Sequence, residues 1–325
     1  SGWETENMCF KMWKGIGYVW RSVSMNKYVA MKSTSKGLFL EIELGFVCNY
    51  RCSYCPPYLH TGDIWIDYEE LKKFINLSKP AHVLLVGGEP TFYPHIDELI
   101  LFLKNKEIII DITSNGSKSL NWWKKHKDNL DIITLSYHIE HANINKFIEK
   151  LKYLTKDKIV TVNVSMIVDR FDECLEAGYK IAKTQNTFVS LKALNNIKTA
   201  RLYDYTDEQL KIMSDVLYPR IKTTSNKNSI DFYGLTSEGK YERQRAQTVI
   251  SNKENVYIGW KCWRGIQYMK LIANGDIFRS TCELGKIPFG NIYNDHIDFP
   301  TEPSICEKDY CFCLTDLKTI DKEKV

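Results

Sequence analysis

The chain has 325 residues, a hydrophobic content of 44% and a formal net charge of +4. This length and composition predict a globular protein with a sizeable core and exclude a disordered chain. Basic and acidic residues are interspersed, as in "KNKE" and "KKHKDN", a pattern typical of solvated helix faces. The charge pattern therefore argues against nucleic acid as a partner.

The sequence lacks an apolar run approaching the roughly 20 residues that span a bilayer, and its first residues do not resemble a signal peptide. We therefore expect a cytoplasmic protein outside the membrane. In that reducing compartment the ten cysteines are expected to be metal ligands or redox groups rather than disulfides. Three lie within residues 48–55 and five within residues 262–313, whereas Cys9 and Cys174 stand alone.

Strand-like and helix-like segments alternate from residue 38 to residue 195. The aromatic-rich residues 1–37 before them predict an extension packed on this region. Expected strands cover residues 38–44, 82–88, 107–114, 131–137, 158–168 and 187–194. Expected helices cover residues 68–78, with a cap at Asp67, and residues 95–106, 119–127, 142–154 and 172–183. Six strands separated by helices predict an α/β fold with a parallel sheet curled into a full or partial barrel.

The alternation stops after residue 195. Residues 196–247 predict a connecting helical segment with one amphipathic helix at 207–218. In "YMKLIANGDIFRS", residues 268–280, an Asn-Gly pair between two strand-like runs predicts a hairpin, which cysteines flank on both sides. The expected domains are therefore 1–37, 38–195, 196–247 and 248–325.

The first cysteine group, Cys48, Cys52 and Cys55, has the spacing Cys-x3-Cys-x2-Cys. A structural zinc site normally needs four protein ligands, and His60 is the nearest fourth candidate. Three thiolates instead suit a 4Fe-4S cluster whose remaining iron is open to a small molecule. The group follows the first expected strand, where the loops of a β/α barrel build active sites. On this motif alone both interpretations stay open.

Four motifs in order resemble the pattern of the radical S-adenosylmethionine (SAM) superfamily. "CNYRCSYC" resembles its signature, including the aromatic Tyr54, and "GGEP", "TSNG" and "LSYH" follow the second, third and fourth expected strands. The resemblance covers about residues 38–195 and favours a cluster over zinc. It implies a partial (β/α)6 radical SAM barrel with a small C-terminal β-hairpin/α auxiliary-cluster domain.

The resemblance also implies the chemistry. Cys48, Cys52 and Cys55 would hold a 4Fe-4S cluster that a flavodoxin or ferredoxin-type protein reduces. SAM would bind the open iron, and its reductive cleavage would give a 5′-deoxyadenosyl radical able to abstract hydrogen from an unactivated C–H bond. The implied SAM contacts, each with a purely structural alternative, are Tyr54, Gly87, Gly88, Glu89, Pro90, Ser114, Asn115, Ser136, Ser165, Met166 and Leu194.

The second cysteine group resembles the SPASM and twitch extensions of this superfamily, which hold auxiliary 4Fe-4S clusters. Its members are Cys262, Cys282, Cys306, Cys311 and Cys313, enough for one cluster. Gly275 precedes Cys282 by seven residues rather than the usual five, so the ligand geometry is open. A structural zinc site is an alternative. We expect four ligands and a role in electron transfer, with Cys311 or Cys313 as the spare, whereas three ligands would leave an iron open to substrate.

We expect the enzyme to dehydrogenate a small carbohydrate-like or natural-product substrate. His138, Glu140 and His141 follow the fourth strand and could supply a base or hydroxyl contacts, or be plain surface groups. One alternative is an epimerase with Cys174 or Cys9 as hydrogen donor. Another is a maturase of a ribosomal peptide or protein, although the 37-residue extension is short for a peptide-recognition domain. The non-enzyme alternative is a zinc-stabilised binding protein.

Overall fold

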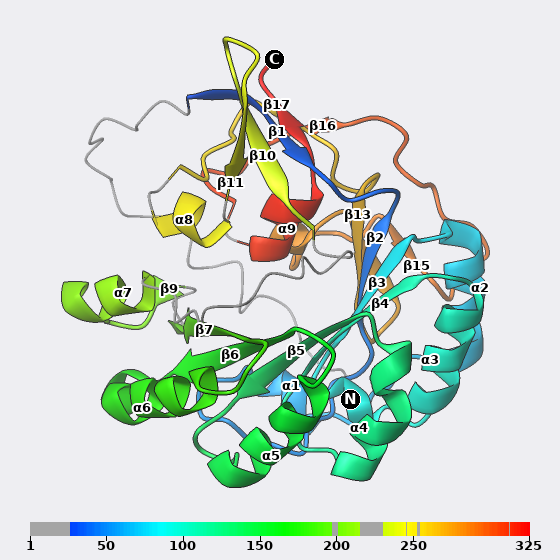
Figure 1. Cartoon of the computed structure of the whole chain (residues 1–325). Coiled ribbons are helices and arrows are strands. Elements are labelled where there is room, and N and C mark those ends of the chain that lie inside the picture. Colours follow the sequence, from blue (N-terminus) through cyan, green and yellow to red (C-terminus); the bar gives the residue numbers. More distant parts are fainter. Residues whose placement is uncertain (1–26, 197–200, 215–229, 245, 252–253, 312) are drawn as a thin grey trace, which may run out of the picture.

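The computed structural model describes residues 27–196, 201–214, 230–244, 246–251, 254–311 and 313–325. Residues 1–26 of the expected extension and residues 215–218 of the expected helix 207–218 lie outside this description. The described chain contains two large sheets, one of nine strands and one of six, and a third sheet of two short strands (Figure 1).

Six parallel strands form the centre of the nine-stranded sheet, whose order is β15-β14-β13-β2-β3-β4-β5-β6-β7. They are β2 (Phe39–Glu43), β3 (His82–Val86), β4 (Ile109–Ser114), β5 (Ile132–Tyr137), β6 (Val160–Met166) and β7 (Thr187–Ala193). The helices that follow them are α2 (Tyr68–Ser78), α3 (Ile96–Asn105), α4 (Leu120–His126), α5 (Ile144–Leu154), α6 (Phe171–Ala182) and α7 (Asp207–Ser214). The predicted partial (β/α)6 barrel is confirmed, with helices α2 to α6 on its outer side (Figure 1).

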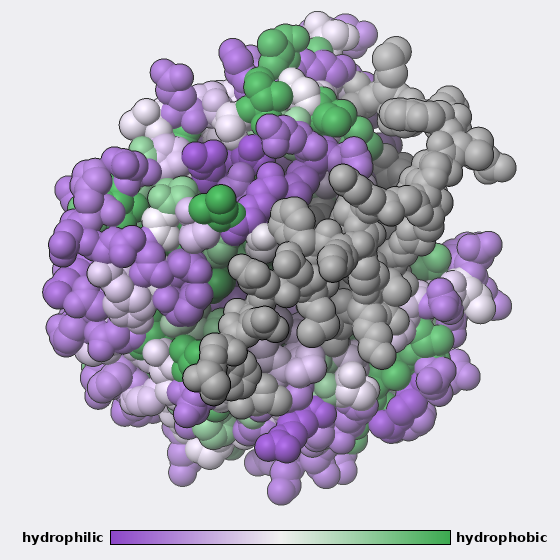
Figure 2. Space-filling view, turned by 180° about the vertical axis from the view of Figure 1, so that it is seen from behind, coloured by the Kyte–Doolittle hydropathy of each residue, from purple (hydrophilic) through white to green (hydrophobic). Residues whose placement is uncertain are grey.

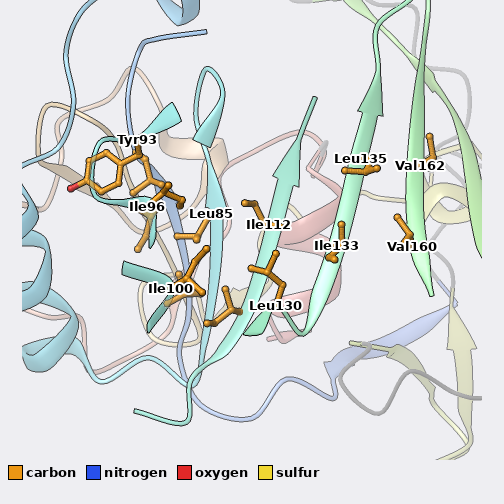
Figure 3. Close-up of a cluster of buried hydrophobic side chains, with 14 of the residues drawn as sticks. Leu85, Tyr93, Ile96, Ile100, Ile112, Leu130, Ile133, Leu135, Val160 and Val162 are labelled. Atoms are coloured by element: carbon orange, nitrogen blue, oxygen red, sulfur yellow. The ribbon is translucent and has the colours of Figure 1, made fainter. Parts of the chain in front are cut away.

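The central strands have one apolar and one polar face. In β4, Ile110 and Ile112 are fully buried in the core between sheet and helices, and Leu135 and Val162 continue this layer on neighbouring strands (Figure 3). Because side chains alternate along a strand, the intervening residues face the inside of the barrel. These inward positions include Thr113, Thr134, Thr161, Asn163 and Ser190. The barrel interior is therefore lined largely by polar groups.

The C-terminal hairpin belongs to the same sheet as the barrel. Strand β13 (Tyr268–Leu271) pairs in parallel with β2 and antiparallel with β14 (Asp276–Phe278), which pairs with β15 (Gly290–Asn291). The predicted turn is present, and Gly275 has a φ of 90°. A Cβ there would lie 2.5 Å from the Tyr293 ring, so both the backbone and the packing require glycine.

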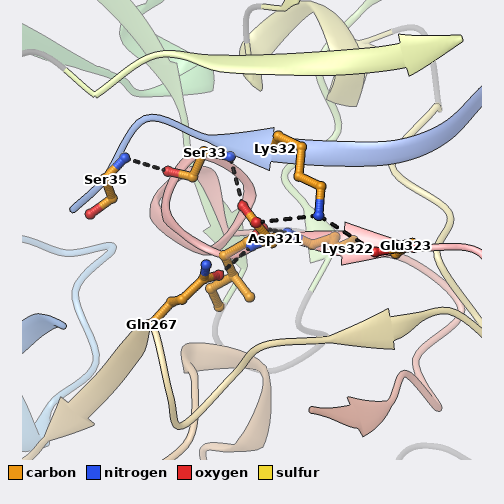
Figure 4. A network of polar contacts seen from close by, with 8 residues as sticks. Lys32, Ser33, Ser35, Gln267, Asp321, Lys322 and Glu323 are labelled. Atoms are coloured by element: carbon orange, nitrogen blue, oxygen red, sulfur yellow. Dashed lines mark hydrogen bonds and ion pairs between the residues drawn. The ribbon is translucent and has the colours of Figure 1, made fainter. Parts of the chain in front are cut away.

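The six-stranded sheet joins segments from both ends of the chain in the order β11-β10-β1-β17-β12-β16. Its strands are β1 (Tyr28–Ser33), β10 (Phe232–Thr236), β11 (Tyr241–Gln244), β12 (Lys261–Cys262), β16 (Ser304–Ile305) and β17 (Lys322–Glu323). Asp321 accepts a hydrogen bond from Ser33 N at 2.7 Å and pairs with Lys32, which ties β1 to the C-terminal segment (Figure 4). Strands β10 and β11 correct the expectation that residues 196–247 are a helical segment.

The remaining described elements are short. They are α1 (Tyr58–Thr61), β8 (Asn195–Asn196), β9 (Arg201–Leu202), α8 (Ala246–Ser251), α9 (Leu314–Thr319), η1 (Pro90–Phe92), η2 (Lys127–Asn129), η3 (Val168–Arg170) and η4 (Thr281–Glu283). Among the described residues, none of the helices has the length and apolar character needed to cross a membrane. Polar side chains predominate among the described residues on the face seen in Figure 2, where apolar ones are scattered.

Candidate active site

The first cysteine loop packs against the turn that follows β3. Gly88 N donates to Gly45 O at 2.9 Å, and Glu89 N donates to Val47 O at 2.8 Å. A Cβ on Gly88 would lie 2.2 Å from Val47 O, a backbone atom that cannot easily move. Glycine at position 88 therefore lets the two backbones meet directly before Cys48.

One cavity at the carboxyl ends of β3, β4 and β5 brings the first cysteine group and most of the predicted SAM contacts together. Predicted residues that line it are Cys48, Cys52, Cys55, Gly87, Gly88, Glu89, Ser114, Asn115, Ser136 and His138. This edge of a parallel sheet is where β/α barrels carry their active sites. Three soft thiolate ligands converging on one cavity fit an iron-sulfur cluster.

Burial and hydrogen bonding shift the pKa values of the three thiols in this loop. Burial raises the pKa of Cys48 to about 11. A hydrogen bond between Cys52 and Cys55 raises the pKa of the first thiol and lowers that of the second. Metal ligation requires thiolates, so binding of a cluster would have to be accompanied by release of protons from this loop.

Glu89 is fully buried and connects the ends of β3 and β4. One carboxylate oxygen accepts hydrogen bonds from Thr91 N, Thr91 Oγ1 and Ser114 Oγ at 3.1, 2.6 and 2.7 Å. The other oxygen accepts from Asn115 N at 2.7 Å. Burial raises the pKa of Glu89, and these hydrogen bonds oppose the rise. The second oxygen retains capacity for another donor, such as an ammonium group.

Asn115 connects the predicted ribose-contact region to the cysteine loop. Its Nδ2 donates to Asn49 Oδ1 at 2.9 Å and lies 3.8 Å from Cys48 Sγ. Ser114 Oγ, besides its bond to Glu89, accepts from Gly116 N at 3.0 Å. Both predicted contacts therefore have structural partners beside the cavity.

The other predicted SAM contacts lie around the cavity rather than among the residues that line it. Tyr54 and Leu194 form a small apolar cluster with Cys52, and Ser165 is a hydrogen-bond partner of Tyr54. Pro90 is buried at the start of η1. Met166 packs in the core between sheet and helices, so its side chain points away from the barrel interior.

His138, Glu140 and His141 contact the cysteine loop instead of standing free in the barrel mouth. Tyr54 Oη and His138 Nδ1 are 2.5 Å apart. Glu140 accepts hydrogen bonds from Ser53, and His141 Nε2 accepts one from Arg51 N. Burial and the nearby Lys192 lower the pKa of His138 to about 4, which leaves the ring neutral. The predicted general-base role stays untested.

A second cavity collects four of the five C-terminal cysteines, Cys262, Cys282, Cys306 and Cys311. Cys262 lies on β12, and Cys306 N donates to Trp260 O at 2.8 Å. Two buried cations, Arg264 and Lys322, line the same cavity. Four thiolates with compensating cations fit one fully coordinated metal centre, whether a 4Fe-4S cluster or zinc.

Cys313 lies outside the residues that line this second cavity. Its Sγ is 3.5 Å from Thr281 Oγ1. Burial raises the pKa of Cys313 to about 12, with a further contribution from Asp316. Of the two cysteines between which the sequence did not decide, Cys311 therefore lines the cavity and Cys313 does not.

A buried chain of hydrogen bonds links Cys313 to the barrel interior. Thr281 Oγ1 is 3.0 Å from Tyr268 Oη, which donates to Glu41 at 2.8 Å. Glu41 also pairs with Lys270 at 2.5 Å. Burial disfavours the charge on Lys270, but Glu41 and Glu43 outweigh it and raise its pKa. The sequence does not reveal this cluster, because its members come from β2 and β13, which are far apart in the chain.

The two lone cysteines lie away from both cavities or outside the described residues, and three residues that were not predicted lie at the first cavity. Cys174 is buried in the core on α6, on the helix side of the sheet, and Cys9 lies outside the described residues. Tyr50 and Thr113 line the first cavity, and Asn49 supports it, without having been predicted. Their positions inside "CNYRC" and "TSNG" were the available signal.

A family model described as the Radical SAM superfamily matches residues 42–204. An S-adenosylmethionine-dependent nucleotide dehydratase from a Thermoplasmatales archaeon is 33% identical over 96 residues, covering 27% of this chain and 33% of the relative. A GTP 3′,8-cyclase from Nautilia profundicola is 24% identical over 212 residues, covering 59% and 62%. The chain thus spans less than two thirds of the length of either relative.

Two solved structures resemble this chain at low sequence identity. The structure of native anSMEcpe with bound AdoMet and Cp18Cys peptide has a TM-score of 0.50 at 15% identity, covering 81% of this chain and 79% of that one. Streptococcus suis SuiB bound to S-adenosylmethionine has a TM-score of 0.49 at 17% identity, covering 82% and 63%. At 15% identity the likeness to anSMEcpe concerns the fold alone.

Proposed function

The chain belongs to the radical SAM superfamily, and from that premise we propose that it abstracts hydrogen from a small polar metabolite and oxidises it. Cys48, Cys52 and Cys55 would hold the 4Fe-4S cluster, which, when SAM is bound, supplies the electron that generates the 5′-deoxyadenosyl radical. The observation that carries the proposal is the single cavity these cysteines share with Gly87, Glu89 and the ends of β4 and β5.

The residues of the chain would bind and orient SAM. The close approach of residues 87 and 88 to the cysteine loop leaves the second oxygen of Glu89 as an acceptor beside the cavity. Asn115 and Ser136 offer side-chain hydrogen bonds at the neighbouring strand ends. A charge-assisted bond from the SAM ammonium to Glu89 would fix the methionyl end.

The polar residues on the inner face of the sheet favour a polar substrate over an apolar one. Its strand positions include Thr134, Asn163 and Ser190, and Lys192 adds a cation near Cys55. Hydroxyl and amide groups suit a molecule with many hydrogen-bonding groups, such as a sugar, better than an apolar one.

The second cavity supports oxidation rather than a redox-neutral outcome. Cys262, Cys282, Cys306 and Cys311 would hold an auxiliary cluster with all irons ligated, suited to accepting an electron from a substrate radical. Removal of that electron would have to be accompanied by loss of a substrate proton. Cys174, a hydrogen donor in the epimerase alternative, is buried away from the barrel interior.

A nucleotide is the second candidate substrate. The archaeal relative is named as a nucleotide dehydratase and the Nautilia profundicola relative as a GTP cyclase, so both names refer to nucleotides. A nucleotide would also suit the polar strand face, with Lys192 available for a phosphate.

Isotope transfer tests the proposal. The reconstituted enzyme would be reduced with dithionite and given SAM with deuterated sugars, or with deuterated GTP and other nucleoside triphosphates. Transfer of deuterium into 5′-deoxyadenosine from a sugar, with a two-electron oxidised product, supports the first candidate. Transfer from a nucleotide without net oxidation supports the second. Formation of 5′-deoxyadenosine without deuterium from any of these compounds would contradict both.

A further inference from the structure

Residues 138–142 form a loop that contacts the cysteine loop; His138 lines the cavity, whereas Glu140 and His141 are not among the residues that line it. Ser53 lies between Cys52 and Cys55 in sequence, and both its backbone N and its Oγ donate to Glu140, at 2.9 and 2.7 Å. Two residues 87 positions apart thus make a two-point contact within the cluster-binding motif.

The loop that carries Glu140 is fixed at both ends. It follows β5 directly, and His141 N and Ala142 N donate to His138 O at 3.1 and 2.8 Å. Asn143 then caps α5 by accepting from Asn145 N and Lys146 N. Because both flanking elements belong to the barrel, Glu140 is held on a rigid support.

Ring contacts reinforce the same junction. Tyr50 stacks on His141 at a centroid distance of 5.0 Å, and Tyr54 stacks on His138 at 6.0 Å. Cys52 Sγ, a Glu140 oxygen and a His141 nitrogen lie within 4.8 Å of one another. The carboxylate is therefore both a backbone anchor and a charge beside one predicted cluster ligand.

We infer that Glu140 is a positioning residue for the SAM-binding cluster: it fixes the turn at Ser53 and lowers the cluster's reduction potential. The inference rests on the proposed role of Cys48, Cys52 and Cys55 as cluster ligands. An anion close to a redox centre disfavours the uptake of an electron, because the added charge is repelled. The two hydrogen bonds from Ser53 would keep the cysteine loop in place and so slow the loss of the cluster.

Two substitutions separate the anchor from the charge. In Glu140→Gln the amide oxygen can accept from Ser53 N and the amide nitrogen can donate to Ser53 Oγ, so both contacts persist without the charge. We expect normal cluster loading and a less negative potential in a redox titration followed by the SAM-dependent change in the cluster's EPR signal. Glu140→Ala removes both contacts and should lose iron to a chelator several-fold faster.

Glu176→Gln is the matched control, since it removes an exposed carboxylate on α6 that pairs with Lys180. It should leave both the potential and the rate of iron loss unchanged. An unchanged reduction potential in Glu140→Gln would overturn the inference that the Glu140 charge lowers the potential. Iron loss from Glu140→Ala at the wild-type rate would overturn the inference that Glu140 fixes the cysteine loop. If Glu140→Ala fails to fold, Ser53→Ala removes the Oγ contact and keeps the backbone one, so a smaller acceleration of iron loss is expected, and iron loss at the wild-type rate is again the contrary result. If the proposed function itself is wrong, the wild-type protein would show no SAM-dependent change in a cluster EPR signal. That result is distinct from a failure of the inference about Glu140.

Discussion

Glu89 is the residue through which the site and the fold are most closely connected. Its two oxygens accept four hydrogen bonds from Thr91, Ser114 and Asn115, and one oxygen remains open to a further donor. The resemblance of "GGEP" to the superfamily pattern predicted a ligand role. The structure adds an internal one, which sequence could not reveal because the partners lie on another strand.

Glu89→Gln should therefore weaken both SAM binding and the fold. Loss of a hydrogen bond to a charged group is expected to reduce SAM affinity by about 1.5–3 kcal/mol. Calorimetric titration of SAM at equal cluster loading measures the change in affinity. Thermal unfolding measures the change in the stability of the fold. Thr91→Val is the control, because it removes one donor to Glu89 and leaves the carboxylate. Unchanged SAM affinity in Glu89→Gln would restrict this residue to its structural role.

Cys311 and Cys313 should differ in their effect on the auxiliary site. Cys311 lines the second cavity, whereas Cys313 is directed to Thr281. We expect Cys311→Ser to lose the auxiliary metal and Cys313→Ser to keep it, as measured by iron analysis of anaerobically purified protein. The reverse pattern would make Cys313 the ligand.

At the scale of elements, local patterns predicted the barrel well. The expected helix 68–78 has those bounds in the structure, and Asp67 caps it by accepting from Glu70 N at 3.0 Å. Strands and helices of the barrel were predictable because their periodicity is local. The pairing of β13 with β2 was not, since it depends on contacts between distant segments. The same reason hid the contacts of residues 138–142 with the cysteine loop.

Gly88→Ala should displace the turn after β3 from the cysteine loop. Its Cβ would lie 2.2 Å from Val47 O and 2.5 Å from Leu59 O, and neither backbone atom can move freely. Such overpacking typically costs about 1–3 kcal/mol. Thermal unfolding of the reconstituted protein checks the effect. Gly239→Ala is a contrasting variant, because a Cβ there would have no neighbour within 4 Å and its cost reflects only the positive φ of 81°. Equal stability of Gly88→Ala and wild type would show that the two backbones can separate without cost.

At the scale of the whole molecule, the C-terminal segment is joined to the barrel by both backbone pairing and buried charge. Strand β13 extends the barrel sheet at β2, and Lys270 pairs with Glu41 where the two strands are in register. The auxiliary site is thus fixed relative to the barrel interior, as an electron acceptor for a bound substrate would need to be.

Lys270→Met tests this junction. It leaves the Glu41 and Glu43 carboxylates buried without their cation, and breaking a buried pair in this way costs about 3–5 kcal/mol. Chemical denaturation should show this loss of unfolding free energy. Adding Glu41→Gln to the same chain should restore part of the lost stability. Additive effects of the two substitutions would contradict a direct interaction.

The most direct test of the account is SAM cleavage by a variant in which Cys48, Cys52 and Cys55 are all replaced by Ala. With both clusters loaded, the wild type should contain about eight irons per chain and, once reduced with dithionite, form 5′-deoxyadenosine from SAM. The triple variant should keep about four irons in the auxiliary site and form none of this product. Undiminished 5′-deoxyadenosine formation by the triple variant would contradict the assignment of these cysteines to the radical SAM cluster.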